Sequence, residues 1–242
     1  MRLDAYLAEN QIYASRTRAE RAVKMGCVKV NGRVVTKCSA DVCENDNIEC
    51  APDPVGYVSR GAYKLIAALD SADIEVRGLF AVDVGASTGG FTQVLLERGA
   101  AGVTAVDVGK NQLAQEIAAD PRVTVLEETD IRCLDNEIYN QKFDLLTCDC
   151  SFISLKSIMH VCHRLLKPSG RAVFLIKPQF EAGRKALNKK GIVKDDALRK
   201  KAVEEVRLFG ESVGFEQLFP IIKSPIEGGD GNTEYLYIVG KR

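Results

Sequence analysis

The sequence has 242 residues, 46% of them apolar and 27% charged, and its 33 basic side chains equal its 33 acidic ones in number. This composition excludes a chain disordered throughout and favours one or two globular domains. No apolar run approaches the roughly 20 residues of a membrane span, and Asp4 and Glu9 interrupt the N-terminus too early for a signal segment, so we expect a cytoplasmic protein without a membrane partner.

The neutral total hides a basic N-terminal stretch. Residues 1–37 contain eight basic side chains and three acidic ones, whereas residues 38–53 contain five acidic side chains and no basic one. Local positive charge of this kind is typical of surfaces that bind polyanions.

Two short helices and a hairpin are predicted in this stretch. Apolar side chains at helical spacing indicate a helix within residues 1–9. A second helix is expected over residues 16–25, begun by Ser15 or Thr17 and ended by Gly26. Asn31-Gly32 between β-branched residues predicts a two-residue hairpin turn.

The charge of this stretch does not by itself distinguish a solvated helix face from an RNA-binding surface. The order of an Arg-Leu-Asp start, a Ser-Arg-Thr-Arg-Ala helix and a Val-Lys-Val-Asn-Gly hairpin resembles the small RNA-binding domain first named for a ribosomal small-subunit protein. The resemblance implies an α+β RNA-binding domain over residues 1–50. The residues expected to contact RNA are Arg16, Arg18, Arg21, Lys24, Lys29 and Arg33.

The eight cysteines do not suggest a metal centre. The four in the N-terminal stretch lack the paired close spacing of a zinc ribbon, and a reducing compartment keeps thiols free. We therefore expect free thiols and no metal ligands. Residues 51–58, which begin Ala-Pro-Asp-Pro, are predicted to be a short stiff linker, followed by a second domain over residues 59–242.

Strands alternate with helices along the second domain. The predicted helices include residues 91–98, 155–166 and 197–213, and the predicted strands are residues 80–84, 103–106, 123–126, 143–147, 172–176, 216–222 and 235–239. This alternation predicts an α/β fold with a Rossmann-like, mostly parallel seven-stranded sheet, in which ligands bind at the carboxyl ends of the strands.

A glycine-rich loop follows the first of these strands. Its pattern, Asp-x-Gly-x-x-x-Gly-Gly, differs from the Gly-x-Gly-x-x-Gly of dinucleotide enzymes, and Asp107 ends the next strand, where a carboxylate can bind ribose hydroxyls. The alternative for Asp107 is a turn or helix cap. The pattern resembles S-adenosylmethionine-dependent methyltransferases, which implies cofactor contacts by Asp83, Gly85, Ser87, Gly89, Gly90, Phe91, Asp107 and Asp130.

Four further segments resemble the FtsJ-type 2′-O-methyltransferases and, more closely, the hemolysin-A (TlyA-type) family. They are Ser-Arg-Gly-Ala-Tyr-Lys at 59–64, Cys-Asp-Cys-Ser-Phe at 148–152, Ile-Lys-Pro-Gln-Phe-Glu at 176–181 and Gly-Asn-Thr-Glu-Tyr at 231–235. The family's catalytic Lys-Asp-Lys-Glu tetrad falls on Lys64, Asp149, Lys177 and Glu234.

The resemblance assigns Lys177 as the base that activates a ribose hydroxyl, with Asp149 orienting it and the other two residues supporting them. A lysine is a base only when neutral, although its free pKa is roughly 10.4. Burial and the like charge of Lys64 lower this pKa, whereas the carboxylates of Asp149 and Glu234 oppose deprotonation. The sequence alone leaves this balance open.

The family resemblance implies methylation of ribose, with cytidine as the expected nucleoside, in ribosomal RNA or ribosomal subunits. One alternative is a non-catalytic RNA-binding or ribosome-assembly factor that keeps a cofactor pocket. The family name also raises hemolysis, although no membrane-inserting segment is visible. An NAD-dependent dehydrogenase shares the predicted sheet but not the glycine spacing.

Overall fold

The computed structural model describes residues 1–13, 15–43, 45–50, 56–134, 136–228 and 231–242. The chain divides into two compact units, Met1–Arg60 and Gly61–Arg242. Of the predicted linker 51–58, residues 51–55 lie outside the described part of the chain, and residues 56–58 belong to the first unit.

The first unit is a small α+β domain. Its elements are α1 (Leu3–Glu9), α2 (Arg16–Lys24), β1 (Val28–Val30), β2 (Arg33–Val34) and β3 (Ile48–Cys50). The hydroxyl of Ser15 accepts a hydrogen bond from the backbone N–H of Arg18 and so caps α2. Buried side chains of both helices, including Leu3, Leu7 and Val23, pack in one core with Val28 of the sheet.

The predicted hairpin joins β1 and β2. Asn31 and Gly32 both have positive φ, 51° and 74°, which a two-residue turn of this hand requires. The antiparallel sheet has the order β2-β1-β3. Strand β3 was not predicted, because three residues within an acidic stretch carry little periodic signal.

The second unit has the predicted Rossmann-like architecture. Its helices are α3 (Ala62–Ser71), α4 (Gly90–Glu97), α5 (Gln115–Ala118), α6 (Met159–Leu165), α7 (Pro178–Glu181) and α8 (Asp196–Ser212), with 3-10 turns at Ile131–Leu134, Leu155–Ser157 and Arg184–Ala186. Its strands are β4 (Phe80–Val84), β5 (Gly102–Val106), β6 (Val123–Leu126), β7 (Phe143–Cys148), β8 (Leu166–Ile176), β9 (Phe215–Gln217), β10 (Ile222–Lys223) and β11 (Tyr235–Lys241).

The sheet has the order β10-β11-β8-β7-β4-β5-β6. Strands β4 to β8 pair in parallel, and β11 runs antiparallel to β8. Strand β9 also pairs with β11. One side of β11 is paired with β8, so β9 and β10 both pair with its other side, at different residues of β11. Together they form one edge of the sheet, which therefore has eight strands in seven positions.

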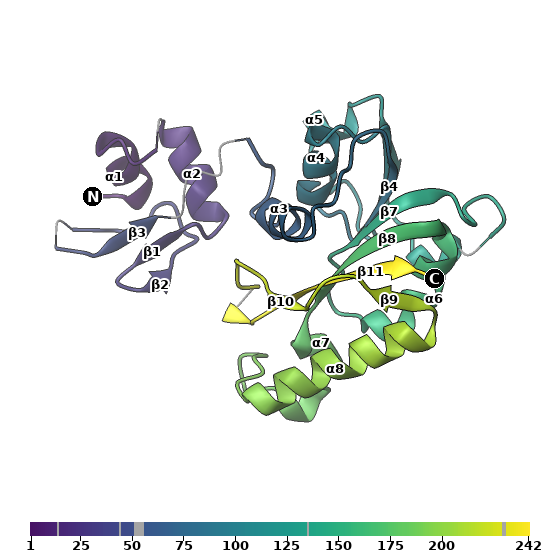
Figure 1. Ribbon diagram of the computed structural model, residues 1–242. Coiled ribbons are helices and arrows are strands. Elements are labelled where there is room, and N and C mark those ends of the chain that lie inside the picture. The colour runs from purple at the N-terminus through teal and green to yellow at the C-terminus, as the bar shows by residue number, and fades with distance from the viewer. Residues whose placement is uncertain (14, 44, 51–55, 135, 229–230) are drawn as a thin grey trace. The chain divides into compact units, whose positions relative to one another are not determined.

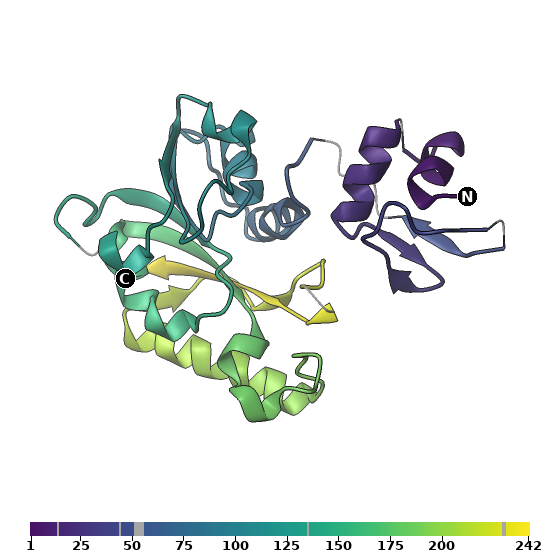
Figure 2. The same cartoon turned by 180° about the vertical axis from the view of Figure 1, so that it is seen from behind.

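Helices cover both faces of this sheet (Figures 1 and 2). Helices α6 and α8 lie on one face, where Met159 and Val206 pack against alternate strand residues such as Val82 and Phe174. Helices α3 and α4 lie on the other face. Because helices cover both faces, side chains on both sides of the central strands are buried, and the sequences of these strands are nearly continuous apolar runs.

Three predicted elements differ from the structure. The strand expected over residues 172–176 begins six residues earlier, at Leu166. The helix expected over residues 155–166 is a 3-10 turn followed by α6, and it ends at Leu165 because Leu166 already pairs with Phe143. The strand expected over residues 216–222 is interrupted between β9 and β10, where Pro220 has no N–H to donate to a ladder. Within the described residues, no helix is long and apolar enough to cross a membrane.

Candidate active site

Two loops meet where the direction of the sheet connections changes. From β4 the chain continues to β5 and β6 on one side, and then crosses to β7 on the other. In open α/β sheets such a point opens a crevice at the carboxyl ends of the strands. Here Gly85 follows β4 with a φ of 78°, and a Cβ on it would lie 3.1 Å from the carbonyl oxygen of Asp149, which follows β7.

Four charged side chains form a chain of contacts at this end of the sheet. Lys64 Nζ lies 2.6 Å from Glu234 Oε2 and 3.8 Å from Asp149 Oδ2. Lys177 Nζ lies 2.6 Å from Asp149 Oδ1. The structure therefore brings together all four residues of the predicted tetrad, in the order Glu234, Lys64, Asp149, Lys177.

The fold accounts for this assembly. Asp149 and Lys177 directly follow the parallel neighbours β7 and β8. Glu234 directly precedes β11, whose first residue, Tyr235, pairs with Ile176 at the end of β8. Lys64 lies in the first turn of α3.

The tetrad is largely withdrawn from solvent. The side chains of both lysines are 8% exposed, that of Glu234 is 3% exposed and that of Asp149 is 21% exposed. Burial acts to lower the pKa of Lys177, but the negative charges of Asp149 and Glu234 outweigh it, and the pKa lies above its usual value. With two lysines and two carboxylates, the cluster is formally neutral.

Asp149 Oδ1 contacts the ammonium of Lys177 at 2.6 Å as an ion pair. This oxygen is buried and has no hydrogen-bond donor among the described residues, because Lys177 contacts it without hydrogen-bond geometry. Lys177 instead donates to the backbone oxygen of Asp149 (3.3 Å) and to the hydroxyl of Ser151 (2.8 Å). A buried acceptor beside an ammonium suits a hydroxyl group that both accepts and donates.

The predicted cofactor residues around the glycine loop lie close to one another. The partly buried carboxylate of Asp107 accepts hydrogen bonds from the backbone N–H groups of Ser87 (2.8 Å) and Gly109 (2.7 Å). Gly89 has a φ of 96° and precedes Gly90, the first residue of α4, while Phe91 is buried. Because a φ of 96° is strained for any residue with a Cβ, this turn favours glycine.

Asp83 and Asp130 lie in different surroundings. Asp83 is fully buried, and its two oxygens accept hydrogen bonds from the hydroxyls of Thr92 (2.7 Å) and Thr147 (2.9 Å). Burial raises the pKa of Asp83 to about 6. The Arg132 guanidinium binds Asp130 and lowers its pKa to about 2.

All six predicted RNA-binding residues of the first unit are exposed. Arg16 pairs with the fully buried Asp4 at 3.2 Å, which Arg2 also binds, and Arg21 donates a hydrogen bond of 2.8 Å to the carbonyl of Tyr57. Lys24, Lys29 and Arg33 present their charges to solvent from the end of α2 and from the hairpin.

Sequence reasoning missed three residues beside the tetrad. Ser151 binds Lys177 as described above. Phe152 has a φ of 65°, is 91% exposed, and contacts Phe180 with ring centroids 5.2 Å apart. Gly228 is buried against Glu234, where an added Cβ would lie 2.1 Å from Oε1. Ser151 and Phe152 could have been found from the sequence, because they belong to the segment Cys-Asp-Cys-Ser-Phe. The position of Gly228 beside Glu234 can be seen only in the folded structure.

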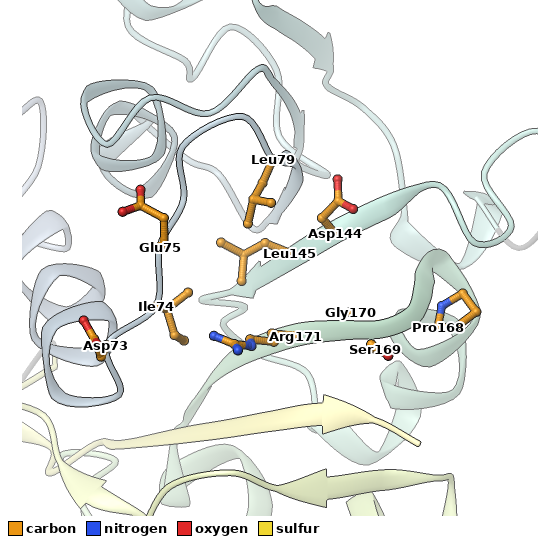
Figure 3. A pocket seen from close by; sticks show the side chains of 10 residues that line it. All are labelled: Asp73, Ile74, Glu75, Leu79, Asp144, Leu145, Pro168, Ser169, Gly170 and Arg171. Carbon is orange, nitrogen blue, oxygen red and sulfur yellow. The ribbon is translucent and has the colours of Figure 1, made fainter.

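A separate hollow of about 500 Å³ lies at the opposite end of the strands (Figure 3). Its lining includes Leu79, just before β4, Leu145 near the start of β7, and Arg171, which lies beside Leu145 in β8. It contains none of the predicted site residues. Within the described residues, no group of three or more His, Cys, Asp or Glu side chains is arranged to hold a metal ion.

Comparisons with known families assign both units. Residues 57–241 match the FtsJ-like methyltransferase family, and residues 1–48 match the S4 domain. The chain is 39% identical to the 16S/23S rRNA (cytidine-2′-O)-methyltransferase TlyA of Mycobacterium tuberculosis, over 97% of this chain and 88% of that protein. It is also 39% identical to Hemolysin A of Brachyspira hyodysenteriae, over 98% of both chains.

Solved structures agree with this assignment. The structure of a Streptococcus thermophilus protein named as a hemolysin is 35% identical to this chain in sequence. The two structures superpose with a TM-score of 0.76, over 100% of this chain and 88% of that one. An S-adenosylmethionine-dependent methyltransferase of Listeria monocytogenes is 17% identical, with a TM-score of 0.57 over 76% of this chain and 100% of that one, and shares the fold. The chain therefore belongs to the FtsJ-like methyltransferases and, within them, to the TlyA or hemolysin A family that carries an N-terminal S4 domain.

Proposed function

We propose that this protein transfers a methyl group from S-adenosylmethionine to the 2′-hydroxyl of a cytidine ribose in ribosomal RNA. The observation that carries the proposal is the buried chain of contacts from Glu234 through Lys64 and Asp149 to Lys177. The names of the relatives from Mycobacterium tuberculosis and Campylobacter jejuni support the nucleoside and the RNA class.

The residues at the carboxyl ends of β4 and β5 fit the cofactor. S-adenosylmethionine supplies an electrophilic methyl group on a positively charged sulfur. The two N–H donors that fix Asp107 leave lone pairs on both of its oxygens, which can accept hydrogen bonds from ribose hydroxyls. Gly85 and Gly89 let the backbone approach a ligand closely.

Asp83 has a positioning role in this proposal. Asp83 lies in β4, and its hydrogen bonds to Thr92 and Thr147 join this strand to α4, which follows the glycine loop, and to the neighbouring strand β7. Because both of its oxygens are buried and occupied, Asp83 acts through the shape of the loop and without touching the cofactor. Asp130, held by Arg132, has no such structural link to the loop.

Lys177 is the proposed base. Its neutral amine takes the proton of the ribose hydroxyl, and Lys177 becomes an ammonium. The bound cofactor would supply the methyl group to the ribose oxygen, and its sulfur would keep the electron pair of the broken carbon–sulfur bond. In the free protein Asp149 keeps Lys177 charged. RNA that closes the site removes more water from the amine, and desolvation lowers the pKa of a lysine towards the range in which it can accept a proton.

The other three tetrad residues hold the acceptor and the base in line. Asp149 contacts the amine of Lys177 at 2.6 Å and orients this base, whose nitrogen takes the single proton of the incoming hydroxyl. Lys64 stabilises the charge of Asp149 from the other side, and Glu234 balances Lys64. Removal of one partner from such a buried pair leaves an uncompensated charge.

The exposed cations of the S4-like unit support RNA binding by that unit. Phosphate contacts of Lys24, Lys29 and Arg33 give affinity without a base preference. Binding by two tethered units raises the effective concentration of RNA at the catalytic cluster.

The test is methyl transfer from labelled S-adenosylmethionine to unmethylated ribosomal RNA or ribosomal subunits, comparing the wild type with Lys177→Ala. Label on the 2′-oxygen of cytidine with the wild type alone supports both the reaction and the base. Label with both proteins rejects Lys177 as the base. Label with neither, while cofactor and RNA still bind, favours a non-catalytic RNA-binding or assembly factor.

A further inference from the structure

The connection between α7 and α8 carries a concentration of positive charge. The segment Gly183–Lys194, here called the basic segment, contains five cations and no acidic residue: Arg184, Lys185, Lys189, Lys190 and Lys194. The second unit as a whole has 24 basic and 25 acidic side chains. The local charge is therefore a property of this segment and not of the unit.

These five cations are exposed and available to a ligand. Within the described residues, none of their side chains makes an ion pair or a hydrogen bond. Many other exposed cations of this unit are neutralised locally, as when Lys200 pairs with Asp196 at 2.8 Å and Arg98 pairs with Asp70 at 2.7 Å. The basic segment thus presents cations that the protein itself does not compensate.

The backbone beneath these cations is held in a defined shape. The side-chain oxygen of Asn188 accepts hydrogen bonds from the N–H groups of Lys190 (2.8 Å) and Ile192 (3.0 Å). Val193 is buried, and the guanidinium of Arg199 donates to the carbonyls of Val193 (2.8 Å) and Lys194 (2.9 Å). A surface ordered before binding loses less conformational entropy when a ligand arrives.

The basic segment adjoins the catalytic cluster. It begins two residues after α7, which directly follows Lys177. Near its other end the carbonyl of Gly191 accepts a hydrogen bond from Asn232, which is 6% exposed and lies two residues before Glu234. Figure 1 shows this connection at the same end of the second unit as the start of β11.

We propose that the basic segment binds the RNA phosphates that flank the reacting ribose, as a phosphate-binding surface of the catalytic unit separate from the S4-like unit. The inference rests on the proposed function, because a ribose within an RNA chain brings a phosphate on each side. Lysines on an ordered loop beside the tetrad match that repeated negative charge without reading base identity. The surface positions the acceptor over Lys177.

The test compares two triple variants of the full-length protein. The first, Lys185→Gln/Lys189→Gln/Lys190→Gln, removes three cations of the basic segment. The matched control, Arg77→Gln/Lys142→Gln/Arg171→Gln, removes three exposed cations outside the basic segment. Arg77 and Lys142 precede β4 and β7, and Arg171 lies within β8, in register with Leu145 near the start of β7. The readout is the Kd for ribosomal RNA transcribed in vitro, measured from 50 to 200 mM salt.

Loss of about three phosphate contacts makes the slope of log association constant against log salt concentration shallower by about 2. Between 50 and 200 mM salt, the Kd of the wild type should therefore rise about 15-fold more than the Kd of the first variant. The control keeps the wild-type slope, and Lys185→Arg/Lys189→Arg/Lys190→Arg restores it. Affinity for S-adenosylmethionine, measured by calorimetry, stays unchanged in all variants.

A first variant with the salt slope of the wild type overturns the proposal, and so does an equal loss in the control. These outcomes are distinct from failure of the proposed function, which is scored by methyl transfer with the wild type. A wild type that binds RNA through the basic segment and transfers no methyl group supports the surface and rejects the reaction.

Discussion

Lys177 donates a hydrogen bond of 2.8 Å to the hydroxyl of Ser151, so the proposed base is held by a residue two positions beyond Asp149. A second donor of the same ammonium is directed to the backbone oxygen of Asp149. These bonds fix where the amine points and explain why β7 and β8 must be adjacent for the site to form. Ser151 is therefore a positioning residue in the proposed mechanism.

Replacement of Lys177 by alanine is expected to lower kcat for RNA methylation by about 10²–10⁴-fold, because general-base assistance is lost. Lys177→Arg keeps the charge, but a guanidinium does not lose its proton and so cannot act as the base, and this variant should be similarly impaired. Cofactor affinity, measured by calorimetry, should change little. Lys142→Ala, which removes an exposed lysine before β7, is the control and should retain full activity. Equal activity of Lys177→Ala and Lys142→Ala would show that the base lies elsewhere.

The exposed ring of Phe152 predicts a contact with RNA. A phenylalanine that is 91% exposed, beside Phe180 and next to the tetrad, offers a surface on which a base can stack. Stacking contributes roughly 1–3 kcal/mol per base, so Phe152→Ala should raise KM for RNA by about 5–150-fold without weakening cofactor binding. Phe80→Ala, at the start of β4 and 53% exposed, provides the control. Unchanged KM in Phe152→Ala would exclude a stacking role.

The architecture of the second unit could be predicted from the sequence because its central parallel strands, such as β4, β5 and β7, are largely buried on both faces. Runs such as residues 80–84 and 172–176 therefore carry a strong apolar signal. The predictions failed for short elements at edges: β3, and the division of one expected strand into β9 and β10 around Pro220. These elements depend on pairing with distant strands more than on local sequence.

The tetrad could be identified through the family resemblance, whereas its electrostatics could not. The sequence left open whether Lys64 or the carboxylates dominate the pKa of Lys177, because the answer depends on distances of a few ångströms. With Asp149 at 2.6 Å, the carboxylates dominate in the free protein. The position of Gly228 against Glu234 was equally invisible, since it depends on how the chain returns to β11.

Gly228 leaves no room for a larger residue beside Glu234. A Cβ would lie 2.1 Å from Oε1, and Glu234 cannot move freely because Lys64 holds it at 2.6 Å. Gly228→Ala should therefore break this buried pair, which costs about 3–5 kcal/mol of stability when it is fully disrupted, and lower methyl transfer at least tenfold.

A double-mutant cycle tests the cause. If the clash with Glu234 is responsible, Gly228→Ala should add little to the loss in Glu234→Ala, in both melting temperature and activity. Additive losses would instead assign the effect to the backbone of the loop.

Asp83 predicts an unusual dependence of stability on pH. Its pKa rises from 3.8 to about 6 on folding because the carboxyl group is buried, so between these values the folded state binds a proton that the unfolded state has released. The contribution of Asp83 therefore lowers the free energy of unfolding as pH increases from about 4 to about 6, by up to about 3 kcal/mol.

Asp83→Asn removes this titration while keeping a polar group between Thr92 and Thr147. In denaturant unfolding from pH 4 to 7, the stability of Asp83→Asn relative to the wild type should increase with pH. The comparison cancels the opposite trend from Asp130, whose pKa is lowered in both proteins. A difference that stays constant over this range would mean that Asp83 titrates normally and that burial does not control its charge.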